Sequence, residues 1–187
     1  MKILAISDRK PKQSIKELVN EHNVEIIITL GDLTYFDLIE LKDINKIPKI
    51  GVYGNHDSGK YFEELGILNL HLNIFDYNGL KFGGFQGSVR YKENPYAIMY
   101  TQEEALELLK DFPHVDVFCA HSPPYGINDD PNDLAHTGLI ALRKYIEEKR
   151  PSYFLHGHTY PQENEITQKY LETTIIYVFG EKIIEIF

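Results

Sequence analysis

The chain has 187 residues, of which 43% are hydrophobic and 25% are charged, so it is long enough to bury the core of one compact domain. Its formal net charge of −9 argues against a dedicated nucleic-acid binder, because such proteins neutralise the phosphate backbone with basic residues. An acidic protein can still bind a phosphorylated molecule if a metal ion supplies the positive charge.

Two further features bear on location. Cys119 is the single cysteine, and one cysteine cannot form an internal disulfide, so a reducing, cytoplasmic setting is predicted. We expect its thiol to be buried packing rather than a nucleophile, since it lies in the apolar run VDVFCA. No run approaches the ~20 apolar residues of a membrane span, so no membrane association is predicted.

In the first third of the chain, short apolar runs alternate with helical patterns. Strands are predicted at residues 2–6, 25–29 and 49–53, and helices at 13–21, 35–41 and 60–65. This β-α-β-α-β order is typical of a largely parallel sheet with covering helices.

The pattern then changes. Residues 70–76 and 80–85 flank Asn78-Gly79 and predict a hairpin, because Asn-Gly suits a two-residue turn. A helix at 101–110 begins with a Thr-x-x-Glu capping box. A strand at 116–120, a helix at 137–148 and a strand at 152–156 follow, and 170–178 with 182–187 predict a second antiparallel hairpin. No linker or repeat interrupts the chain, so a single domain over 1–187 is predicted.

Polar residues follow five of these strands directly. They are Asp8, Gly31-Asp32, Gly54-Asn55-His56-Asp57, His121 and His158. In open α/β sheets ligands bind outside the carboxyl ends of the strands, so these residues are expected to converge. Imidazole, carboxylate and amide oxygen together suit a divalent transition metal. Taken singly, either aspartate could instead begin a loop or cap a helix, and His156, on a strand, is interpreted as structural.

This ordered set resembles the calcineurin-like metallophosphoesterase superfamily. The motifs D, GD, GNHD, H and GH occur in the family's order between Asp8 and His158, and HSPPYG at 121–126 is similar to its fourth motif. The resemblance implies an α/β fold, a four-layer α/β/β/α sandwich with two mixed β-sheets. It also implies metal-dependent hydrolysis of a small phosphorylated substrate.

The resemblance also implies roles for individual residues. Asp32 would bridge two metal ions, with Asn55, His121 and His158 completing one site and Asp8 belonging to the other. His56 would be catalytic, facing the scissile phosphate and either protonating the leaving oxygen or stabilising charge. The implied cofactor is a divalent transition metal such as Mn, Fe, Zn or Ni, as one or two ions.

The sequence departs from the family pattern at three positions. The first motif, D-x-H, ends in Lys10 here, and the last, G-H-x-H, ends in Tyr160. The final aspartate of GDxxD is replaced by Tyr35, although Asp37 lies close in sequence. Both missing imidazoles would serve the ion that Asp8 binds. We therefore hypothesise one tightly bound ion, with Lys10 placing its ammonium group near the carboxylates.

The predicted function is a phosphoesterase acting on a phosphodiester or a small phosphomonoester. Lys10, Tyr160 and His136 are the candidate substrate-binding residues, and the long polar loop 126–138 would border the crevice. Tyr160 could instead be a phenolate ligand, and His136 could serve the helix entry. The alternative function is a catalytically degenerate member that binds a nucleotide or a protein partner. The sequence leaves the oligomeric state open.

Overall fold

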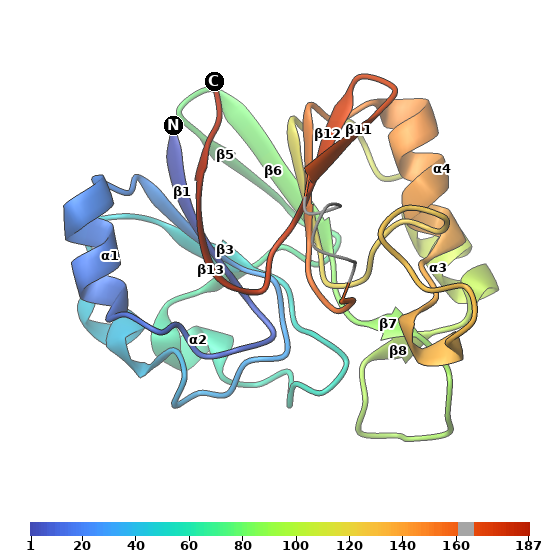
Figure 1. The fold of residues 1–187 in the computed structure, drawn as a ribbon, viewed down its shortest axis with the longest axis horizontal. Helices are drawn as coiled ribbons and strands as arrows, with labels where there is room; N and C mark the ends of the chain where they lie inside the picture. The colour runs from blue at the N-terminus through green and yellow to red at the C-terminus, as the bar shows by residue number, and fades with distance from the viewer. Residues whose placement is uncertain (161–166) are drawn as a thin grey trace.

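The computed structural model describes residues 1–160 and 167–187, and two large β-sheets packed face to face form its centre (Figure 1). The first sheet contains, in spatial order, β13 (Gly180–Glu185), β1 (Lys2–Ser7), β2 (Ile26–Thr29), β3 (Lys49–Gly51) and β4 (Leu68–Asn69). The second contains β11 (Thr167–Tyr170), β12 (Thr173–Tyr177), β10 (Tyr153–His156), β9 (Val117–Ala120), β6 (Leu80–Phe85) and β5 (Ile74–Tyr77). A small parallel pair, β7 (Ser88–Val89) and β8 (Met99–Tyr100), accompanies them.

Helices cover the two outer faces. On the side of the first sheet lie α1 (Ile15–His22), α2 (Phe62–Leu65) and the 3-10 turn η1 (Ile39–Asp43) (Figure 1). On the side of the second sheet lie α3 (Gln102–Leu109) and α4 (Ile140–Lys149). The 3-10 turn η2 (Leu134–His136) precedes α4 in the chain. The predicted four-layer α/β/β/α sandwich with two mixed sheets is therefore confirmed.

Alternating side chains explain why the strands read as continuous apolar runs. On β1, Ile3 and Ala5 join the core between the sheets, whereas Leu4 and Ile6 pack under the first helical layer. The same alternation divides β9, where Cys119 belongs to the inter-sheet core. A strand buried on both faces needs apolar residues at every position. Cys119 is fully buried, as predicted, and burial raises the pKa of its thiol.

Several local signals act as the sequence predicts. Thr101 and Glu104 form the reciprocal capping box at the start of α3. Asn78 and Gly79 adopt φ values of 50° and 80° between β5 and β6, the left-handed conformation that a tight hairpin turn requires. Within the described residues, no helix is both long and apolar enough to cross a membrane.

The predicted C-terminal hairpin is wrong. Strand β12 pairs with β11 on one side and β10 on the other, in the second sheet, whereas β13 pairs antiparallel with β1 in the first. The chain crosses between sheets just before Gly180, whose φ of 73° suits glycine. Each strand gains a long-range partner, which a local pattern cannot reveal.

Other boundaries also differ. The predicted strand 70–76 begins only at Ile74, because Leu72 has a φ of 55° that breaks the extended run. The helix predicted at 35–41 is only the 3-10 turn η1. The helix predicted from residue 137 begins at Ile140, because Thr137 and Leu139 remain extended.

Candidate metal centre

The carboxyl ends of the five motif-bearing strands meet at one edge of the molecule. Strands β1, β2 and β3 run parallel in the first sheet, and β9 and β10 run parallel in the second. Asp8 follows β1, Asp32 follows β2, Asn55 follows β3, His121 follows β9 and His158 follows β10. The loops after these strands carry the candidate site.

Four side chains form a compact group, which we call the ligand cluster: Asp32, Asn55, His121 and His158. One ligand atom each from Asp32, His121 and His158 lies within 4.8 Å of the others. The Nε2 atom of His121 is 3.5 Å from Oδ2 of Asp32 and 3.1 Å from Oδ1 of Asn55. These predicted ligands therefore come together.

Backbone carbonyls orient the two imidazoles of the cluster. Nδ1 of His121 lies 2.7 Å from the carbonyl oxygen of Leu30 and donates to it, which leaves the Nε2 lone pair facing the cluster. Nε2 of His158 donates to the carbonyl oxygen of Ala135 at 2.8 Å, which leaves Nδ1 of that ring free. A hydrogen bond from the second ring nitrogen is how metal-binding histidines are commonly fixed.

The donor set fits a divalent transition metal. When only Nδ1 carries a proton, the Nε2 lone pair of His121 and the carbonyl oxygen of Asn55 lie 3.1 Å apart as two acceptors in a buried site. The buried Nδ2 of Asn55 has no hydrogen-bond partner among the described residues. A cation between these atoms would satisfy both lone pairs. Two imidazole nitrogens, a carboxylate and an amide oxygen suit Mn, Fe or Zn.

Charge in the cluster is strongly coupled. Burial opposes the charged form of His121, but the carboxylates of Asp32 and Asp8 outweigh it and raise the pKa of His121 to about 9. Burial likewise opposes ionisation of Asp32, yet the charge of His121 holds the pKa of Asp32 well below its usual range. Burial, and then the charge of His121, lowers the pKa of His158 to about 3. The metal-free cluster thus holds one proton where a cation would bind.

The Asp8 side is organised differently. Both carboxylate oxygens of Asp8 accept the backbone N–H of His158, at 3.1 and 2.9 Å, and Oδ2 also accepts the Ser7 hydroxyl at 2.6 Å. Lys10 is exposed and forms no ion pair with any described residue. Asp8 therefore positions the His158 backbone, and the hypothesised contact between the Lys10 ammonium and the carboxylates is not present.

Backbone conformation at these strand ends is unusual. Asp8, Asp32 and His158 have φ values of 61°, 53° and 69°, a left-handed region that costs energy outside glycine. Gly157 explains how Asp8 comes so close to β10: a Cβ there would lie 2.0 Å from the Ser7 hydroxyl oxygen and 2.3 Å from Oδ2 of Asp8. Neighbouring packing holds three strained residues at one site, as is common where residues converge for function.

Asp57 is a positioning residue that the sequence analysis left without a role. Its buried carboxylate accepts the backbone N–H groups of Asp32 and Leu33 from one loop and of Gly54 from another. It thereby ties the loop after β2 to the loop after β3. Burial is the main cause that raises the pKa of Asp57 to about 6. The motif position was visible in the sequence, since Asp57 is the last residue of the GNHD motif, but its role was not.

Asp37 does not replace the missing aspartate of GDxxD. Its Oδ2 accepts the backbone N–H and the hydroxyl of Thr34, at 2.9 and 2.7 Å, so it closes a local turn. Tyr35, which stands at the motif position, accepts a hydrogen bond at its hydroxyl oxygen from Lys42. The loop after Asp32 thus brings no further carboxylate to the cluster.

His56 is exposed at the edge of the cluster. Its backbone N–H donates to Oδ1 of Asp32 at 2.9 Å, which fixes the backbone at the point from which the ring projects. The ring lines a cavity of about 370 Å³ together with Asp32 and Tyr35. A proton donor at this position can reach a group bound in that cavity.

His136 and Tyr160 form a chain of neighbouring rings with His158. The His136 ring is 5.2 Å from the His158 ring and 5.7 Å from the Tyr160 ring, centroid to centroid. Both line a cavity of about 240 Å³ that also contains Asp130. Nδ1 of His136 pairs with Asp133 at 2.5 Å. Burial, and then the charges of Asp8 and Asp32, raises the pKa of Tyr160, which favours a protonated phenol.

His156 lies behind the cluster and is fully buried. Its Nδ1 donates to the Gly157 carbonyl, and its Nε2 accepts from the amide of Asn128 at 2.9 Å. With both ring nitrogens engaged, His156 acts structurally, holding loop 126–138 against β10.

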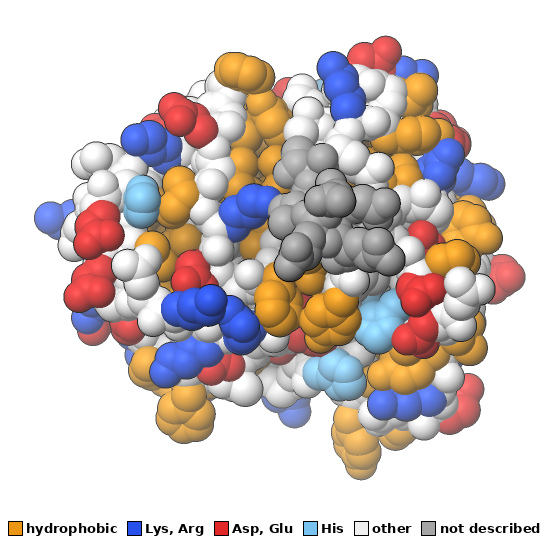
Figure 2. All heavy atoms as spheres, viewed as in Figure 1, with side chains coloured by type: hydrophobic (Ala, Val, Ile, Leu, Met, Phe, Trp, Pro, Cys, Tyr) orange, Lys and Arg blue, Asp and Glu red, His pale blue; other side chains and the backbone are white. Residues whose placement is uncertain are grey.

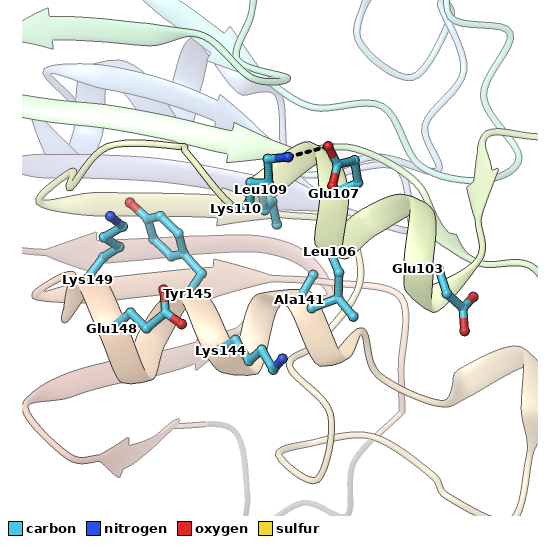
Figure 3. A pocket seen from close by; sticks show the side chains of 10 residues that line it. All are labelled: Glu103, Leu106, Glu107, Leu109, Lys110, Ala141, Lys144, Tyr145, Glu148 and Lys149. Atoms are coloured by element: carbon cyan, nitrogen blue, oxygen red, sulfur yellow. Dashed lines mark hydrogen bonds and ion pairs between the residues drawn. The ribbon is translucent and has the colours of Figure 1, made fainter.

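A cavity of about 480 Å³ lies elsewhere, in the groove between α3 and α4 (Figure 3). Leu106, Ala141 and Tyr145 line its base, and Lys110 pairs with Glu107 on its rim. Among the described residues, the His, Cys, Asp and Glu side chains whose ligand atoms converge in a group of three or more are Asp32, His121 and His158, so the metal-binding chemistry belongs to the ligand cluster.

Comparisons with known proteins agree with this architecture. A family model described as calcineurin-like phosphoesterase matches residues 1–162. Among curated proteins, none matches the chain. A solved crystal structure aligns with a TM-score of 0.66 and 16% identity, over 94% of this chain and 89% of the other. TT1561 of Thermus thermophilus aligns with a TM-score of 0.61 and 17% identity, over 96% of this chain and 89% of that one.

A more distant structure has the same fold. GAP50, the anchor in the inner membrane complex of Plasmodium, aligns with a TM-score of 0.52 and 10% identity, over 95% of this chain and 70% of that one. At these identities the structures show the shared fold alone.

Proposed function

Because the chain belongs to the calcineurin-like phosphoesterase family, we propose that it is a metal-dependent hydrolase of a phosphodiester or a small phosphomonoester. The observation that carries the proposal is the ligand cluster, in which Asp32, His121 and His158 offer ligand atoms within 4.8 Å of one another. Asn55 adds a fourth donor at 3.1 Å from His121. We further propose that the protein acts in the cytoplasm on a small phosphorylated substrate.

We propose that the cluster holds one ion tightly, such as Mn, Fe, Zn or Ni. A bound divalent cation supplies charge that polarises a phosphoryl oxygen and lowers the pKa of water. The Asp8 side would hold a second ion weakly at most, because Asp8 is already engaged by Ser7 and the His158 backbone. Lys10 and Tyr160 stand where two further imidazoles would be needed.

The remaining steps, proton transfer, substrate binding and support of the ligand loops, would fall to other residues of the chain. His56, exposed beside the cluster and held by its backbone at Asp32, would donate a proton to the leaving oxygen. Lys10, Tyr160 and His136 would bind the substrate, with Lys10 supplying positive charge near the phosphoryl oxygens. Asp57 would keep the Asp32 and Asn55 loops at a fixed separation.

A second function deserves a test because of the Asp8 side. Its engaged carboxylate, together with Lys10 and Tyr160 at the two altered motif positions, would suit a degenerate family member that binds a nucleotide or a protein partner without hydrolysis. The retained His56 favours the enzyme, because a protein that only binds has less need of a proton donor at this position. Activity separates the two functions.

The test is Mn²⁺-dependent hydrolysis of bis(p-nitrophenyl) phosphate and p-nitrophenyl phosphate by the wild type and His121→Ala. We expect turnover in the wild type and background rates in the variant, because His121 supplies a central ligand. His114→Ala is the matched control, since His114 is exposed and contacts the Lys149 carbonyl instead. Equal background rates in all three proteins would contradict hydrolysis of these esters and favour the binding function.

A further inference from the structure

Two exposed aromatic rings form a corner beside the ligand cluster. Tyr160 is 67% exposed and Phe179 is 39% exposed. Their ring centroids are 5.6 Å apart and their planes meet at 76°. We call this pair the aromatic patch. Tyr160 follows β10 and Phe179 immediately precedes β13, so two sheets contribute to it.

The aromatic patch is close to the metal ligands. Tyr160 contacts His136 at 5.7 Å between ring centroids, and His136 in turn contacts the ligand His158 at 5.2 Å. Tyr160 also lines the cavity of about 240 Å³ that His136 borders. A substrate held at the cluster would therefore lie within reach of the patch.

Positive charge borders the aromatic patch on the side of the loop after β1. The guanidinium carbon of Arg9 lies 5.0 Å from the centroid of the Phe179 ring, a cation–π distance. Lys10 follows it and is also exposed. Figure 2 shows hydrophobic, histidine and basic side chains gathered around the centre of this face. In a chain of net charge −9, these cations near the ligand cluster are favourably placed for an anionic substrate.

We propose that Tyr160 and Phe179 bind a flat aromatic substituent of the substrate, and that they select aromatic over aliphatic phosphoesters. The inference rests on the proposed function, since the phosphoryl group would be held at the ligand cluster. Two rings set nearly at right angles let a third ring stack on one and meet the edge of the other. The Arg9 guanidinium holds the Phe179 ring in place and offers positive charge to the esterified group.

The test measures binding separately from hydrolysis. Phenylphosphonate, cyclohexylphosphonate and methylphosphonate are titrated into the protein by calorimetry, with and without saturating Mn²⁺. The three probes share a phosphonate and differ only in the substituent, and none carries a hydrolysable ester. We expect phenylphosphonate to bind about tenfold more tightly than the other two, the effect of one stacking contact.

Variants locate the selectivity. Phe179→Leu and Tyr160→Leu keep an apolar side chain but remove the ring, and each is expected to reduce the preference for phenylphosphonate severalfold. Phe187→Leu is the matched control, because Phe187 is 99% exposed at the C-terminus, away from the ligand cluster. Thermal unfolding verifies that each variant is folded, and two independent patch variants guard against the loss of one.

Each outcome decides the proposal. A phenyl preference that Phe179→Leu or Tyr160→Leu removes and Phe187→Leu retains supports it. Equal binding of the phenyl and cyclohexyl probes overturns it in favour of a general apolar site. Equal binding of the phenyl and methyl probes, or binding of none, overturns it outright. A patch-dependent phenyl preference in a protein without turnover leaves the aromatic site standing and contradicts the phosphoesterase proposal.

Discussion

The two sides of the site use similar residue types to different ends. Around Asp32, the side chains direct unshared lone pairs into one buried space, and carbonyls of Leu30 and Ala135 fix the two imidazoles from behind. Around Asp8, the carboxylate accepts the Ser7 hydroxyl and the His158 backbone N–H, and Lys10 and Tyr160 stand where the family motifs have imidazoles. The difference teaches that a carboxylate at a strand end forms a metal site only together with other ligand side chains that converge on it.

An aspartate-to-asparagine substitution on each of the two sides should have the largest difference in effect on metal affinity. Asp32→Asn is expected to weaken Mn²⁺ binding at least about a hundredfold, because a ligand charge at the cluster is lost. Asp8→Asn should weaken it only about tenfold, at the low end of the range for outer-shell groups, because Asp8 acts through the His158 backbone. Calorimetric titration of both variants measures this. Equal losses would show that Asp8 is itself a ligand.

Restoring the two imidazoles of the family motifs should strengthen metal binding on the Asp8 side. The double variant Lys10→His/Tyr160→His is expected to bind a second Mn²⁺ roughly tenfold to a hundredfold more tightly than the wild type, because it gains two donors beside Asp8. Equilibrium dialysis of Mn²⁺ gives the stoichiometry. Lys12→His/Tyr96→His, which makes the same replacements at exposed positions, is the control. Two equally tight ions in the wild type would contradict the asymmetry.

Asp57 tests whether the cluster depends on its supporting loops. Asp57→Asn presents an amide N–H₂ to backbone donors that now have a carboxylate, so we expect a loss of about 2 kcal/mol in the free energy of unfolding. Mn²⁺ affinity should fall about tenfold, as for other outer-shell groups. Urea unfolding and calorimetry measure the two effects. Asp37→Asn, which alters only a local turn at Thr34, should change Mn²⁺ affinity little.

The pH dependence of metal binding should reflect His121 rather than His158. The folded-state pKa of His121 is raised to about 9, so below that pH the metal must displace a proton. Apparent Mn²⁺ affinity should therefore rise up to about tenfold between pH 7 and pH 8 and level off above pH 9. His158, whose pKa is lowered to about 3, is already neutral and adds no dependence there. A flat affinity profile would contradict the protonated His121.

Part of the secondary structure could be predicted from the sequence, because the signals for it lie within a few neighbouring residues. Strand β1 and the α3 capping box depend on neighbouring residues alone. The positions of Asp8, Asp32 and His121 at strand ends needed only the parallel order of the sheet to predict convergence. The family motifs added the order and the expected roles, and the four-layer fold followed.

What only the tertiary structure decided involves partners distant in sequence. Strand β13 pairs with β1 rather than with β12, and it thereby forms an edge of the first sheet. The two paired strands lie at opposite ends of the sequence, so no local pattern predicts this pairing. The hydrogen bonds that the Asp8 and Asp57 carboxylates accept come from backbone N–H groups that are near them only in the folded chain. The contact of Phe179 with Tyr160 has the same origin, since each follows a different strand into the same space.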